Sequence, residues 1–113
     1  MDLNEFIRWV SYYFDFDINK DQIYYKTLHA SYDQFKNSSL NGVPFPELYS
    51  GEELYFEVLH SWLRHLRLIA KQIPAVGSRI TLNIEGIPLN DYSHRKSSLL
   101  DEIDQLMTRC GCD

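Results

Sequence analysis

Residues 51–73 form the segment in which apolar side chains repeat most clearly at helical spacing, and they constrain the fold most. At about 100° per residue, the apolar side chains of this segment cover an arc of about 200° around a helix. A helix that is apolar around more than half of its circumference has to pack against at least two other elements. The sequence therefore predicts a central helix at residues 51–73 that stops at Pro74.

Three further segments repeat apolar residues at the spacing of one helix face: residues 3–14, about 20–36 and about 98–110. Three of the four helices begin with two residues at the spacing of a capping box, whose side chains bond reciprocally to the backbone. These pairs are Asp2 and Glu5, Asn19 and Gln22, and Ser50 and Glu53. Gly111 suits the position just beyond the last helix, which favours a left-handed backbone.

Between the third and fourth helices, Ile80, Leu82 and Ile84 alternate with polar residues, which predicts a half-buried strand at residues 79–85. A single strand leaves its backbone N–H and C=O groups without partners, so it needs a second strand. Three partners fit the sequence: residues 87–89 folding back, the extended segment 43–49, or the same strand of a second subunit.

The length and composition are those of one globular domain, with 44% hydrophobic and 24% charged residues. The sequence therefore predicts a single α+β domain over residues 1–113. This domain is expected to be mostly helical, with about four helices and one short β element near 79–85, between the third and fourth helices. Residues 37–48 are expected to form the main loop.

Aromatic residues are unusually frequent, with eight Tyr, six Phe and two Trp making up 14% of the chain. A single domain of this size cannot fully bury all these rings together with its aliphatic side chains. Neighbouring residues such as Tyr12 and Tyr13, or Tyr24 and Tyr25, cannot share one helix face. At least one ring of each pair is therefore expected to lie outward, where tyrosine is a good interface residue.

The net charge is −5, which disfavours nucleic-acid binding because phosphate contact requires a basic surface. A basic protein is the better electrostatic match. The sequence has no apolar run long enough to cross a membrane and no visible signal peptide, so a cytoplasmic location is expected. The two cysteines, Cys110 and Cys112, fit reduced thiols in that compartment.

The stretch FDFDINKD at residues 14–21 places oxygen-bearing side chains at every second position, as in a calcium loop. An EF-hand also needs Gly at its sixth position and a bidentate Glu at its twelfth. Those positions hold Lys20 and Lys26, which argues against calcium. The stretch is better interpreted as a helix junction whose apolar residues point inward and whose acids form a rim, with Asn19 capping the second helix.

Other chemistry has little support in the sequence. Glu57 and His60 match half of a di-iron motif, but there is no second Glu-x-x-His, and a solvated helix face explains both. The Cys110–Cys112 pair lacks the second pair that structural zinc requires. A nucleophile elbow and a glycine-rich phosphate loop are both missing. No catalytic residue, metal or cofactor is expected, and the chain is predicted not to be an enzyme.

These features favour a small protein that binds and blocks a basic surface of another protein, as an inhibitor, an immunity-type protein or an adaptor does. The predicted partner-binding residues are Tyr13, Asp15, Asp17, Asp21, Tyr24 and Tyr25. One alternative is a small enzyme or ligand-binding domain with a pocket near the third helix and the strand. Another is a structural homo-oligomer, such as a homodimer that pairs through the strand at 79–85.

Overall fold

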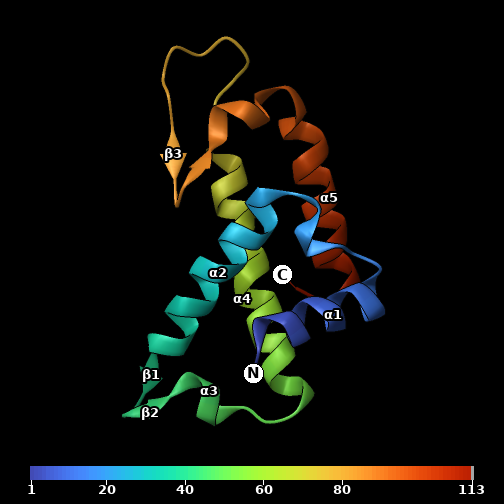
Figure 1. Ribbon diagram of the computed structural model, residues 1–113, viewed down its shortest axis with the longest axis vertical. Coiled ribbons are helices and arrows are strands. Elements are labelled where there is room, and N and C mark those ends of the chain that lie inside the picture. The colour runs from blue at the N-terminus through green and yellow to red at the C-terminus, as the bar shows by residue number, and fades with distance from the viewer. Residues whose placement is uncertain (113) are drawn as a thin grey trace.

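The computed structural model describes residues 1–112, which form a mostly helical α+β fold, as the sequence predicted (Figure 1). Two small antiparallel strand pairs accompany the helices. The elements in chain order are α1 (Leu3–Phe14), η1 (Ile18–Lys20), α2 (Gln22–Asn37), β1 (Ser39–Leu40), β2 (Val43–Pro44), α3 (Phe45–Leu48), α4 (Glu52–Lys71), β3 (Asn83–Ile84), β4 (Ile87–Pro88), η2 (Leu89–Arg95) and α5 (Lys96–Arg109). Within residues 1–112, each helix is too short or too polar to cross a bilayer.

Helix α4 is the centre of the fold, with α2 packed on one side and α5 on another (Figure 1). Its buried side chains are Val58, Leu59, Trp62, Leu63, Leu66, Ile69 and Ala70. The predicted central helix is therefore confirmed, because α2 and α5 both pack against the wide apolar arc of α4. The predicted Ser50 cap is wrong. Gly51 occupies the cap position with φ 59°, and α4 begins one residue later without a side-chain cap.

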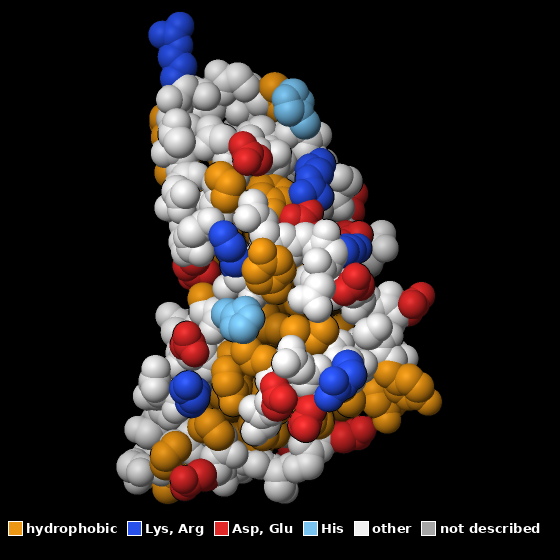
Figure 2. Space-filling model, viewed as in Figure 1, with side chains coloured by type: hydrophobic (Ala, Val, Ile, Leu, Met, Phe, Trp, Pro, Cys, Tyr) orange, Lys and Arg blue, Asp and Glu red, His pale blue; other side chains and the backbone are white. Residues whose placement is uncertain are grey.

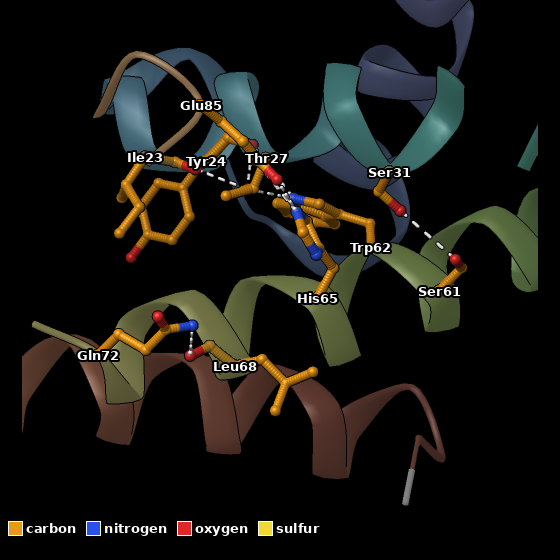
Figure 3. A network of polar contacts seen from close by, with 10 residues as sticks. All are labelled: Ile23, Tyr24, Thr27, Ser31, Ser61, Trp62, His65, Leu68, Gln72 and Glu85. Carbon is orange, nitrogen blue, oxygen red and sulfur yellow. Dashed lines mark hydrogen bonds and ion pairs between the residues drawn. The ribbon is translucent and has the colours of Figure 1, made fainter. Parts of the chain in front are cut away.

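The interface between α2 and α4 contains a buried polar contact around Trp62 (Figure 3). The Trp62 indole N–H donates to the Tyr24 carbonyl oxygen at 3.1 Å and to the Thr27 hydroxyl at 2.9 Å. Thr27 in turn donates to the Ile23 carbonyl at 2.6 Å. A buried indole needs such an acceptor, so these bonds fix how the two helices face each other.

Helix α2 begins later than the sequence predicted, and Asn19 is not its cap. The Asp17 side chain instead accepts a hydrogen bond from the Asn19 backbone N–H at 3.0 Å and caps the short helix η1. The chain then becomes extended at Asp21, and α2 starts at Gln22. Burial of Ile18 inside η1 explains the extra turn, because it brings this side chain into the core before α2 begins.

Helix α5 is held at both ends. Near its start, Lys96 Nζ donates to the carbonyl oxygens of Lys71 and Ile73 at 3.1 and 2.8 Å, which satisfies acceptors at the end of α4. At its other end Gly111 has φ 70°, and the Cys112 N–H donates to the Met107 carbonyl oxygen at 2.8 Å. This is a Schellman motif and confirms the predicted role of Gly111.

The predicted strand at 79–85 is shorter than expected. Only Asn83–Ile84 forms a strand, β3, which pairs antiparallel with Ile87–Pro88 across a turn at residues 85–86. The fold-back alternative is therefore the correct partner within the chain. Segment 43–49 is not the partner: its first two residues form β2, which pairs with β1, and it continues into α3. Residues 37–48, predicted as a loop, thus contain a small hairpin and a helical turn.

Candidate protein-binding surface

The junction between α1 and α2 separates its residues into an inner and an outer set. Phe16 and Ile18 are buried, whereas Asp15 and Asp17 are exposed, which is the alternation predicted for FDFDINKD. Asp15 ends α1 in a left-handed conformation, with φ 50°. Within residues 1–112, neither Asp15 nor Asp17 takes part in an ion pair. Their charges therefore remain directed at solvent.

Two tyrosines lie just before these carboxylates at the end of α1. The Tyr12 side chain is 83% exposed and that of Tyr13 is 56% exposed. Their rings contact edge to face, with centroids 5.1 Å apart. Tyr13 also contacts Trp9 at 5.6 Å, and Trp9 stacks on Tyr55 of α4 at 5.2 Å. A chain of aromatic contacts thus connects the exposed rings to the central helix. We call Tyr12, Tyr13, Asp15 and Asp17 the α1 surface.

The charge distribution around α1 is mixed but has an acidic end. On the face drawn in Figure 2, apolar side chains gather over α1 and the adjoining part of α2, and charged side chains of both signs border them. Glu5 and Arg8 lie on the exposed side of α1, where they offset each other. The C-terminal end of the helix and the following junction carry Asp15 and Asp17. The excess of negative charge therefore lies next to the exposed tyrosines.

Asp21 and Tyr24, which the sequence placed in the same binding set, lie elsewhere. They line a polar pocket of about 310 Å³ between the α1–α2 junction and α5. The Tyr92 hydroxyl donates to Asp21 Oδ1 at 2.5 Å, and Arg95 pairs with the other oxygen of this carboxylate. The Tyr24 hydroxyl donates to Glu102, which also pairs with Lys20 at 2.7 Å. We call these residues, Lys20, Asp21, Tyr24, Tyr92, Arg95 and Glu102, the polar clasp.

The pKa values in the polar clasp favour charged carboxylates and neutral phenols. Burial opposes ionisation of Asp21, but the Tyr92 hydroxyl and the Arg95 guanidinium outweigh it and lower the pKa of this carboxyl. Glu102 behaves likewise, because Lys20 and Tyr24 outweigh its burial and lower its pKa. Burial and the nearby carboxylate raise the pKa of Tyr92 to about 12. At neutral pH the carboxylates of Asp21 and Glu102 are therefore charged and the Tyr92 hydroxyl keeps its proton.

The structure therefore divides the six predicted binding residues. Tyr13, Asp15 and Asp17 lie together on the α1 surface. Tyr24 is only 2% exposed and Asp21 is engaged with Tyr92 and Arg95, so both leave the binding set. Tyr25 lies half-buried on α2. Tyr24, about 100° from Tyr25 around the helix, is buried, and its hydroxyl reaches Glu102 of α5.

Sequence reasoning missed Tyr12, the most exposed of these aromatic side chains. The signal was present in the periodicity of α1. Phe6 and Val10 define its buried line, and Tyr12 lies about 200° around the helix from Val10. Tyr12 therefore lies opposite the apolar helix face that the sequence predicted for residues 3–14.

The polar side of α4 is covered in part by the C-terminal end of the chain. His60 Nε2 lies 3.0 Å from the Cys110 carbonyl oxygen, and Arg67 pairs with Asp104 at 3.1 Å. Cys110 is buried, which raises the pKa of its thiol. Within residues 1–112, no three His, Cys, Asp or Glu side chains come together in a way that would hold a metal ion.

Comparison of the chain with protein-family models, with curated proteins and with solved structures gives no significant match.

Proposed function

We propose that this protein binds a basic surface of another protein and blocks it, as an inhibitor, an immunity-type protein or an adaptor does. One observation carries the proposal: two adjacent tyrosines, 83% and 56% exposed, lie beside two carboxylates that take part in no ion pair within residues 1–112. Aromatic side chains that a small domain leaves exposed in a group are typical of binding sites.

The aromatic contacts support an anchoring role for Tyr12 and Tyr13. The two rings touch each other, and Tyr13 also touches Trp9, which stacks on α4. A ring that is already held loses little conformational freedom when a partner covers it. Tyrosine also offers a hydroxyl that remains able to bond at the edge of a contact. The α1 surface is therefore suited to bury these rings at a modest entropic cost.

The charges support a basic partner. The chain carries a net charge of −5, and Asp15 and Asp17 add local negative charge beside the rings. Charges around a contact mainly accelerate association and select the partner, and they do so most strongly at low salt. Tyr12 and Tyr13 are thus proposed to provide most of the binding affinity. Asp15 and Asp17 are proposed to raise the association rate and to select a basic partner.

The test compares capture by the tagged protein with capture by two variants, using extracts of the cells that produce it. Replacing Tyr12 and Tyr13 by Ala removes the proposed anchors and leaves good helix formers in α1. Circular dichroism and urea unfolding establish that this variant still folds. We expect the wild-type protein to retain a basic protein in near-stoichiometric amount, and the Tyr variant to lose it. Equal capture by both proteins contradicts the proposed surface.

The charge variant replaces Asp15 and Asp17 by Asn. With the captured protein purified, we expect its association rate to fall several-fold at low salt and to approach the wild-type rate at high salt. The matched control replaces Glu47 and Asp101, two exposed acids that take part in no ion pair within residues 1–112, by Gln and Asn. Both variants change the net charge equally. If they slow association equally, local steering is refuted and only the total charge matters.

A further inference from the structure

The β3–β4 hairpin leaves one edge of its first strand open. Leu89 N–H donates to the Leu82 carbonyl oxygen at 3.0 Å, so Asn83 and its partner Pro88 form a non-hydrogen-bonded pair. The backbone N–H and C=O of Asn83 therefore point away from β4. The backbone N–H and C=O of Thr81, two residues earlier, also point away from β4, because these directions alternate along an extended chain. Within residues 1–112, no hydrogen bond reaches the backbone groups of Thr81 or Asn83 on this side.

The side chain of Asn90 extends the paired edge beyond β4. Its amide oxygen accepts from the Leu82 N–H at 2.8 Å, and its amide nitrogen donates to the Ile80 carbonyl oxygen at 2.8 Å. These bonds engage the side of residues 80–82 that faces Asn90, and they hold this segment extended as a continuation of β3. The free outer edge thus runs over residues 80–84, although only Asn83–Ile84 counts as strand.

The hairpin is fixed to the helices, which keeps this edge in place. His65 of α4 pairs with Glu85 at 2.8 Å, and Lys26 Nζ donates to the Gly86 carbonyl oxygen at 2.8 Å (Figure 3 shows His65 and Glu85). In Figure 1, β4 lies between β3 and the helices, and β3 forms the outer border. A held, unpaired strand edge is a template for another strand.

The side chains along this edge are unusually apolar for an exposed position. Ile80 is 67% exposed, and Leu82 and Ile84 are partly exposed. All three lie on the same side of the extended segment because side chains alternate along it. Proteins commonly protect such edges with charges or proline. In this hairpin the proline, Pro88, lies in β4 and lacks the N–H that a further strand on that side would need. The outer edge of β3 has no proline.

We propose that this edge pairs antiparallel with the same edge of a second copy of the chain. When Leu82 faces Leu82 of the second copy, Thr81 faces Asn83, and their outward backbone groups bond in the hydrogen-bonded register. Ile80 then lies opposite Ile84 and becomes buried. Just beyond the paired segment, Arg79 lies near Glu85 of the second copy, so the charges at both ends are complementary.

The self-complementarity of this register favours a second copy over an unrelated peptide. A two-fold arrangement brings the same patch of both chains together, and each apolar and charged side chain then meets a suitable neighbour. The paired edge is short and buries less than the roughly 1,200 Å² of a stable interface. We therefore expect a reversible dimer with a dissociation constant above about 1 μM. The α1 surface plays no part in this contact, so it is separate from the proposed function.

Sedimentation velocity on the full chain, from low to high micromolar concentration, tests the dimer. We expect the wild-type protein to shift from monomer to dimer, and Ile80→Asp to raise the dissociation constant at least about tenfold, because each dimer buries two copies of this side chain. Val76→Asp is the matched control, since Val76 is 59% exposed in the same loop but outside the edge. A wild-type chain that stays monomeric up to about 1 mM overturns the proposal.

The charge at Arg79 tests the register. Arg79→Glu places like charges at both ends of the paired segment and is expected to weaken the dimer, whereas Arg79→Lys keeps opposite charges there and is expected to retain most of the affinity. Unfolding curves of each variant establish that the chain still folds. Equal weakening by Ile80→Asp and Val76→Asp, or by Arg79→Glu and Arg79→Lys, overturns the proposed pairing.

Discussion

Replacing Asp21 by Ala is expected to lower the free energy of unfolding by about 2–3 kcal/mol. Tyr92 is 2% exposed and its hydroxyl lies 2.5 Å from Asp21 Oδ1. A hydrogen bond to a charged group contributes about 1.5–3 kcal/mol, and its loss leaves the Tyr92 hydroxyl without this acceptor.

Half of the Arg95 side chain is exposed, so its ion pair with Asp21 adds at most about 1 kcal/mol. We therefore expect Arg95→Ala to lower stability by less than about 1 kcal/mol.

Urea unfolding followed by circular dichroism measures these differences. Tyr92→Phe, made alone and together with Asp21→Ala, completes a double-mutant cycle that isolates the coupling between the two side chains, expected at about 1–2 kcal/mol. Asp101→Ala is the control because Asp101 is exposed on α5 and forms no ion pair with the residues that the structure describes, 1–112. It is expected to change stability by less than about 0.5 kcal/mol.

The effect of Asp21 also has a defined pH dependence. The folded protein lowers the pKa of this carboxyl below its unfolded value of about 3.9, so its contribution is present above that pH. The contribution is lost as the pH falls through the lower, folded value. The difference between the wild-type protein and Asp21→Ala should therefore shrink in acid. Equal destabilisation by Arg95→Ala and Asp21→Ala would contradict the dominant role of the Tyr92 hydrogen bond. A difference between wild type and Asp21→Ala that stays the same in acid would contradict the lowered pKa of Asp21.

Two further predictions concern buried rings. Trp62→Phe is expected to lower stability by about 2–4 kcal/mol, because it opens a cavity in the core and removes the N–H that bonds Tyr24 and Thr27; urea unfolding measures it. The pKa of Tyr92 is raised to about 12 in the folded state, so stability should fall as the pH rises from about 10 towards 12, by about 1–3 kcal/mol. The same measurement on Tyr92→Phe should show a smaller decline, and an equal decline would contradict the assignment.

The positions of the main helices could be predicted because their signal is local. In α4 the apolar side chains alone specify a central helix, and two neighbours cover it. The helix starts were less predictable, since the capping pattern around Asn19 and Ser50 is equally consistent with neighbouring registers. Contacts outside each helix decided between them. Burial of Ile18 added the turn η1, and the left-handed Gly51 moved the start of α4.

The strand and the polar clasp show where the sequence stops being informative. Alternation predicted a strand at 79–85, but strand length depends on the partner, and β4 ends at Pro88 before the chain turns into η2. The clasp joins Asp21 and Tyr24 to residues that follow 71 to 78 positions later. The repeat of apolar residues in α2 indicates which side of the helix faces inward. It does not indicate that Tyr92, Arg95 and Glu102, which are distant in the sequence, will contact that helix and the residues before it.

The same short junction both anchors the fold and presents the proposed binding surface, and these two roles support each other. Phe16 and Ile18 are buried, and the next residues are fixed by Lys20 and Asp21 through the polar clasp. Asp15 and Asp17 therefore project from a backbone that is held on both sides. Carboxylates on a free loop would have to be ordered when a partner binds, which weakens the contact. Because the buried side chains of Phe16 and Ile18 alternate with Asp15 and Asp17, these two acids are already positioned before any encounter.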